Sequence, residues 1–96
     1  MTNNFSPKQP SEEYYLGFNF TNDLAGEALV SAVVTYSPAL ETGSLIDDEK
    51  QELSGNTVLF WVQGGVHLTT YKITAVVTGS NDSVYEMDGT LTVREL

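Results

Sequence analysis

The sequence contains no cysteine among its 96 residues. Neither a disulfide nor thiol chemistry is open to it, so a compact fold must be held together by packing alone. This composition suits a reducing compartment. The single histidine, His67, also leaves too few ligands for a zinc site, which needs three or four. We therefore expect no metal and no other cofactor.

Basic residues are scarce as well. Four Lys and Arg stand against thirteen Asp and Glu, which gives a net charge of -9. A surface this acidic repels phosphate backbones and anionic lipid, so we expect neither nucleic-acid nor membrane binding. No apolar run approaches the roughly 18 residues of a membrane span, and the polar N-terminus does not suggest a secretion signal. The acidity serves either solubility or docking on a basic partner.

No pattern of catalytic residues is present. His67 would need a serine or aspartate brought to it by the fold, and the neighbouring threonines show no sign of activation. The acidic residues at 47–52 lack the alternating aspartates of a calcium loop. The Gly64-Gly65 pair does not lead into a helix with Lys and Ser or Thr, as a phosphate loop would. The sequence therefore predicts a protein that is not an enzyme.

Two β-rich runs, residues 57–62 and 71–78, dominate the remaining pattern. Gly64 and Gly65 lie between them and supply the positive φ angles of a turn. The first run is apolar on both of its faces, including the only tryptophan, Trp61. It therefore predicts a central strand, or one whose outer face is covered by the loop before it.

Further β-branched or alternating runs predict additional strands. They cover residues 13–20, 28–36, 83–87 and 90–94, with a short strand possible at 45–46. Asp88-Gly89 predicts a bulge or turn that interrupts the last strand. Residues 47–53 are compatible with one helical turn or with an acidic surface loop. The chain as a whole predicts an all-β fold, an antiparallel sandwich.

The N-terminal residues differ from the rest in composition. They carry asparagine, serine and two prolines, Pro7 and Pro10. We expect a flexible N-terminal arm over residues 1–12 and a single domain over residues 13–96. The arm is either simply disordered or becomes ordered on a neighbouring subunit.

The order and spacing of the late segments point to a family. Residues 60–65, which read Phe-Trp-Val-Gln-Gly-Gly, are followed by residues 71–78 and by Leu-Thr-Val-Arg-Glu at 91–95. This arrangement resembles small Ig-like structural proteins of tailed bacteriophages and prophages. Two departures are visible: Leu68 stands where that family has a third glycine, and residues 81–83 replace its usual Gly-Arg.

The resemblance implies an Ig-like antiparallel β-sandwich of about seven short strands. It also implies a virion structural or assembly protein that acts by protein–protein contact on the capsid or neck. Such proteins decorate the head, join head to tail as connector components, or belong to fibres. The implied partners are other virion proteins, bound by several copies of the chain. The implied location is the virion, and the host cytoplasm during assembly. The alternative is an Ig-like binding module for carbohydrate or a host surface, which the aromatic residues suggest.

Two sets of residues carry these predictions. The residues predicted to contact a partner at an exposed loop are Val66, His67 and Leu68. The residues predicted to be structural are Trp61, Gly64, Gly65 and Tyr71. Tyr71 fits the tyrosine corner of Ig-like sandwiches, whose hydroxyl bonds back to the preceding loop. Trp61 is expected in the core, although partial exposure would favour a ligand platform instead.

Overall fold

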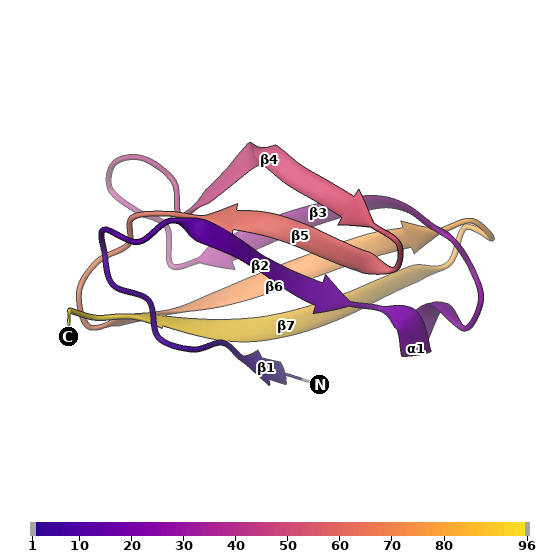
Figure 1. Cartoon of the computed structure of the whole chain (residues 1–96), viewed down its shortest axis with the longest axis horizontal. Helices are drawn as coiled ribbons and strands as arrows, with labels where there is room; N and C mark the ends of the chain where they lie inside the picture. Colours follow the sequence, from indigo (N-terminus) through magenta and orange to yellow (C-terminus); the bar gives the residue numbers. More distant parts are fainter. Residues whose placement is uncertain (1, 96) are drawn as a thin grey trace.

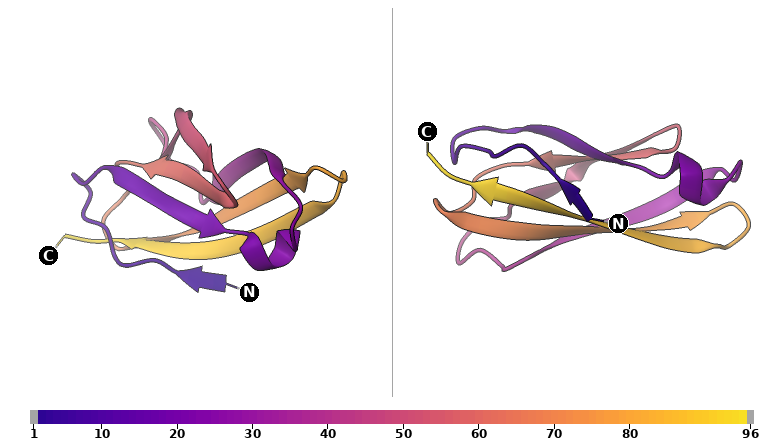
Figure 2. Two further views of the ribbon diagram at one scale, coloured as in Figure 1. Left: turned by 45° about the vertical axis from the view of Figure 1, so that its right-hand side comes forward. Right: turned by 90° about the horizontal axis from the view of Figure 1, so that it is seen from below.

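The computed structural model describes residues 2–95, which form two β-sheets packed face to face (Figure 1). One sheet has the strand order β1-β7-β6-β3 and the other has the order β2-β5-β4. The two layers are seen edge-on in the right-hand view of Figure 2. The elements are β1 (Thr2–Asn4), β2 (Tyr14–Asn19), α1 (Thr21–Leu24), β3 (Leu29–Ser37), β4 (Ile46–Ser54), β5 (Thr57–Val62), β6 (Thr69–Gly79) and β7 (Val84–Val93).

The strand order is that of an immunoglobulin-like sandwich. In that fold the second, fifth and fourth strands share one sheet, and the third, sixth and seventh share the other. Here β2-β5-β4 and β7-β6-β3 reproduce this division. Within each sheet the pairs are antiparallel, except that β1 runs parallel to β7. The predicted all-β sandwich with seven strands is confirmed. Within residues 2–95, no helix has the length and apolar character needed to cross a membrane.

The core forms between the inner faces of β5 and β6. In β5 the alternate residues Val58, Phe60 and Val62 are buried, because successive side chains of a strand point to opposite faces. In β6 the same alternation buries Tyr71 and Ile73, with alanine and valine beyond them. Each large apolar side chain buried in this way contributes about 1.5–3 kcal/mol relative to exposure. β5 is the central strand of its sheet, as its two apolar faces predicted.

The acidic stretch at 47–53 was predicted to be a helical turn or a loop, and that prediction is wrong. These residues form most of β4, which pairs with β5 at both of its ends. The register shifts between Asp47 and Glu52, so the strand is irregular in the middle. The backbone of β5 forms antiparallel pairs with this stretch, and the local sequence of 47–53 does not predict that pairing. Pairing between strands has therefore overridden local propensity.

The predicted interruption at Asp88-Gly89 is also absent. β7 runs without a register shift along β6 from Val84 to Val93. A Cβ atom on Gly89 would lie 2.5 Å from the ring of Phe5. The glycine therefore makes room for an aromatic ring from the N-terminal segment. In a strand interior, such a glycine marks a close approach rather than a turn.

Part of the N-terminal stretch that was predicted to be a flexible arm over residues 1–12 lies along β7 in the structure, while Met1 falls outside the described residues. β1 pairs with β7, and beyond it the backbone N–H of Phe5 donates to the carbonyl oxygen of Thr90 at 3.0 Å. The Phe5 ring packs edge-on against Phe18 and Phe60, with centroids 5.4 and 5.9 Å apart. The free edge of β7 and the open side of the core together hold this segment in place, and neither is visible in the polar sequence of the segment itself.

We predict that Gly89→Ala lowers the free energy of unfolding by about 1–3 kcal/mol, because the added methyl group overpacks the site of the Phe5 ring. Denaturant unfolding of the purified variant measures this loss. In a Phe5→Ala background the same substitution is expected to cost much less, which a double-mutant cycle would show. An equal cost in both backgrounds would contradict the proposed contact.

Candidate assembly surface

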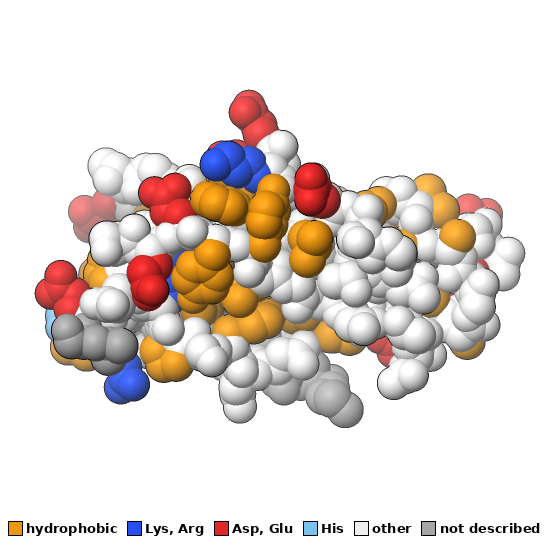
Figure 3. Space-filling model, in the orientation of Figure 1, with side chains coloured by type: hydrophobic (Ala, Val, Ile, Leu, Met, Phe, Trp, Pro, Cys, Tyr) orange, Lys and Arg blue, Asp and Glu red, His pale blue; other side chains and the backbone are white. Residues whose placement is uncertain are grey.

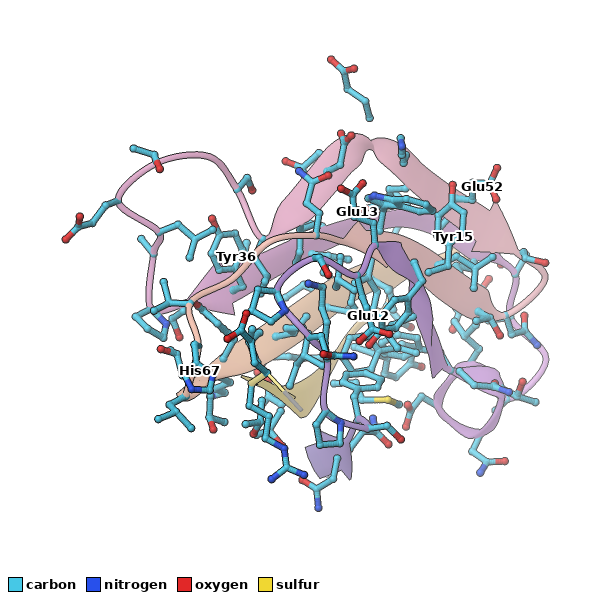
Figure 4. All side chains as sticks on the ribbon, turned by 60° about the vertical axis from the view of Figure 1, so that its left-hand side comes forward. Glu12, Glu13, Tyr15, Tyr36, Glu52 and His67 are labelled. Carbon is cyan, nitrogen blue, oxygen red and sulfur yellow. The ribbon has the colours of Figure 1, made fainter. Side chains whose placement is uncertain are left out.

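The connection between β5 and β6, residues 63–68, carries all three residues predicted to contact a partner. Because β5 and β6 belong to different sheets, this connection crosses from one layer to the other at one end of the sandwich (Figure 1). Val66 is 57 % exposed and Leu68 is 75 % exposed. His67 lies between them in the sequence and is also exposed; it is labelled in Figure 4. The three side chains therefore share one protruding tip, which we call the β5–β6 tip (residues 66–68).

Hydrogen bonds hold this tip in one conformation. The backbone N–H of Val66 donates to the hydroxyl oxygen of Tyr71 at 2.9 Å, and Tyr71 itself is buried. The N–H of Leu68 donates to the carbonyl oxygen of Val93 at 2.7 Å. The N–H of Thr69 donates to the carbonyl oxygen of Val66 at 3.1 Å. A loop fixed in this way loses little conformational entropy when it binds. The Tyr71 contact supports our prediction of a tyrosine corner.

Two glycines directly before the tip allow the backbone to turn there. Gly64 and Gly65 have φ angles of 58° and 98°, in the left-handed region that glycine adopts without strain. A Cβ atom on Gly65 would also lie 2.7 Å from the side chain of Val93. The positive φ angles predicted from the sequence are present, and they support a structural role for both glycines.

A buried lysine anchors the base of the same loop. Lys8 is fully buried, and its ammonium group donates to three backbone carbonyl oxygens. The acceptors are those of Gln9 at 2.8 Å, Pro10 at 3.3 Å and Gly64 at 2.6 Å. Burial lowers the pKa of Lys8, and the carboxylates of Glu12 and Glu13 act in the opposite direction. The role of Lys8 is not predictable from the sequence, because nothing in its local sequence distinguishes it from a surface lysine.

A cleft of about 870 Å³ opens beside the β5–β6 tip. Residues 38–44 form one wall and residues 63–66 form the other, with Tyr71 between them. The lining combines apolar side chains, such as Leu40, with the carboxylates of Glu13 and Glu41. Carboxylates next to apolar side chains in this lining suit a partner segment that combines apolar and basic side chains.

Trp61 was expected in the core, and that expectation is wrong. It lies on the outer face of β5 and is only partly buried, because it alternates with the inward-facing Phe60 and Val62. Its ring packs edge-on against Tyr15 at 5.0 Å, and the ammonium of Lys50 lies 4.1 Å from the ring centroid.

Figure 3 shows hydrophobic side chains gathered on this outer face, with acidic side chains around them. The Trp61 indole N–H is buried and has no hydrogen-bond partner among the residues that the structure describes. Partial exposure is what a ligand platform requires. A sugar, however, could stack on the ring face near Lys50 only after that side chain had moved. The carbohydrate alternative therefore gains little support.

The hydrogen bond that the structure describes for the His67 side chain is with the backbone. Its Nδ1 atom accepts a hydrogen bond from the N–H of Glu95 at 3.0 Å, which links the tip to the end of the described chain. Across residues 2–95, no group of three or more His, Asp or Glu side chains is placed to hold a metal ion.

The fold and this surface place the protein in a structural class. It is a small Ig-like β-sandwich with an exposed, hydrogen-bonded apolar tip at one end. The model of the family described as "Podophage GP4 fiber-tail adaptor protein gp77" matches residues 8–94, so the chain belongs to this family. A search of curated proteins finds no match. The matched region begins at Lys8 and includes the whole β5–β6 connection.

Membership of this family confirms the resemblance to small phage structural proteins. It makes the chain a phage structural protein of the tail or neck kind, which is part of the virion and assembles with other virion proteins. An adaptor family also suggests a role other than catalysis.

We predict that Tyr71→Phe lowers the free energy of unfolding by about 1–2 kcal/mol, because it leaves the N–H of Val66 without its acceptor. Chemical denaturation measures the change. Tyr36→Phe is the matched control, since the Tyr36 hydroxyl makes no hydrogen bond within the described chain and its ring lies near that of Tyr71. Equal losses in the two variants would contradict a structural role for the Tyr71 hydroxyl.

Proposed function

We propose that this protein is an adaptor component that joins two other virion proteins where fibre and tail meet, and that it binds one of them through the β5–β6 tip. The family description supports a place at the tail or neck rather than decoration of the capsid. Several copies act together, and they join the particle during assembly in the host cytoplasm. In this proposal the protein acts by contact with other proteins.

The observation that carries the proposal is the conformation of Leu68. Its φ angle is 64°, a left-handed value that costs a non-glycine residue about 1–2 kcal/mol. The side chain is also 75 % exposed, so burial within this chain does not offset the cost. A strained residue with an exposed apolar side chain is a reason to infer a functional contact.

Charge indicates what kind of surface the tip meets. The chain carries a net charge of -9, and the carboxylates of Glu13 and Glu41 line the cleft beside the tip. Opposite charges on the partner would speed encounter and set the orientation of docking. The proposed partner surface is therefore apolar at its centre and basic around it.

We predict that Leu68→Gly separates stability from assembly. Glycine adopts the left-handed conformation freely, so we expect the free energy of unfolding to stay equal or to rise by up to about 1 kcal/mol. The same substitution removes the exposed side chain, and we expect the amount of the protein in purified particles to fall by roughly tenfold or more. Thermal unfolding and quantitative mass spectrometry of particles measure the two effects.

Val84→Ser is the matched control, because Val84 is 64 % exposed and lies at the hairpin between β6 and β7, at the other end of the molecule. It should leave the content of particles unchanged. Normal incorporation of the Leu68→Gly variant would rule out the tip as a binding surface. Absence of the native protein from particles, and from assembly intermediates, would overturn the adaptor role altogether.

A further inference from the structure

We propose that the C-terminal half of β3, residues 33–37, is a strand-addition site that receives an extended, basic segment of a second virion protein. The inference rests on the proposed adaptor function, which requires a second contact besides the β5–β6 tip. In strand addition, a peptide pairs with the free edge of a sheet through main-chain hydrogen bonds, and pockets beside the edge take alternate side chains.

The outer strands of the two sheets differ in how well their edges are protected. β1 has only three residues, and β2 has six with Gly17 among them. β4 carries five charged residues and an irregular register. Shortness, charge and irregularity all discourage pairing with another chain. β3 is nine residues long and contains no charged residue, glycine or proline. It is therefore the edge best suited to accept a strand.

Only the second half of this edge is open. The register shifts between Leu29 and Ser31, which forms a bulge at the start of the strand. The carbonyl oxygen of Ala32 accepts a hydrogen bond from the side-chain amide of Gln51 at 3.0 Å. Gln51 belongs to β4, so this carbonyl points away from β6. The first half of β3 is therefore less suited to an added strand, because it is bulged and its Ala32 carbonyl is already bonded to its own chain.

Alternation along the strand then identifies the free groups. In an antiparallel strand, the N–H and C=O of one residue point to the same side, and those of the next residue point to the other. Because Ala32 faces the open edge, the backbone groups of Val34 and Tyr36 face it too. Those of Val33 and Thr35 face β6. Within the described residues, β3 is the last strand of its sheet, so an added strand would meet Val34 and Tyr36.

A hollow of about 320 Å³ lies beside this open segment. Val34, Thr35 and Tyr36 form one side, and Ile46 and Asp48 of β4 lie opposite. An inward-facing side chain of an added strand would enter this space between the two sheets. The exposed carboxylate of Asp48 suits a lysine or arginine at that position.

The charge of the molecule favours a different protein over a second copy. Two copies paired through β3 would bring two acidic molecules together, each with a net charge of -9. A basic segment of another virion protein meets no such repulsion and complements Asp48. We therefore assign the site to an extended segment that alternates apolar or β-branched residues with at least one basic residue.

The absence of cysteine allows a direct test in assembled particles. Val33→Cys and Val84→Cys each introduce one thiol at closely matched positions, since the valines are 63 % and 64 % exposed. Both thiols should react with maleimide at similar rates in the free protein. In particles, an added strand would lie about 5 Å from Val33 and slow its reaction by roughly tenfold, while Val84 stays reactive. Equal rates at Val33 in free and assembled protein, or equal slowing at both positions, overturn the proposal.

The role of Asp48 is tested by a matched pair of charge reversals. Asp48→Lys and Glu49→Lys change the net charge equally, and both residues are exposed on β4, but only Asp48 lines the hollow. We expect Asp48→Lys to restore rapid maleimide reaction at Val33→Cys in particles, or to reduce incorporation by roughly tenfold. Glu49→Lys should do neither. Equal behaviour of the two variants overturns the assignment of a basic segment.

A photoreactive amino acid at Thr35 identifies the occupant. Cross-linking to another virion protein supports the proposal, whereas a dimer of this chain, or no product in particles that contain the chain, overturns it. These outcomes leave the adaptor function intact. Absence of the native chain from particles would instead defeat the adaptor function itself, so the two failures are distinguishable.

Discussion

The packing of the inner faces of β5 and β6 is the interaction on which the rest of this structure depends. Phe60 and Val62 on one strand, and Tyr71 and Ile73 on the other, belong to one buried cluster, yet the two strands lie in different sheets. The chain must therefore cross between layers immediately after Val62. That crossing is the β5–β6 connection, so the same burial that stabilises the sandwich also creates its protruding tip.

Three side-chain or backbone contacts hold the tip and its base, and two of them come from parts of the chain that are distant in sequence. Lys8 holds its base from the N-terminal segment, Tyr71 holds Val66 from β6, and Val93 holds Leu68 from β7. A buried ammonium group is costly to desolvate, and three carbonyl acceptors offset that cost. The contacts that close the sandwich therefore also fix the conformation of the tip, which is the surface proposed to bind a partner.

The proposed adaptor would hold two partners at once, and we have proposed a separate surface for each of them. The β5–β6 tip lies at one end, and the proposed strand-addition site at 33–37 lies along the edge formed by β3. The loop at 38–44 forms a wall of the cleft beside the tip, and it also contributes Ala39 and Ser44 to the hollow beside β3. One loop therefore stands between the two proposed contacts, while the rigid sandwich fixes the distance between them.

The sequence by itself determined the all-β class, the strands at 57–62 and 71–78, and the exposed apolar loop between them. These features follow from the period of two and from glycine, which act locally. Only the tertiary structure decided that the acidic stretch at 47–53 is a strand, that the N-terminal segment joins the sheet, and that Trp61 faces outward. Strand pairing and the satisfaction of a buried ammonium depend on partners far along the chain, such as Gly64 for Lys8, which no local pattern specifies.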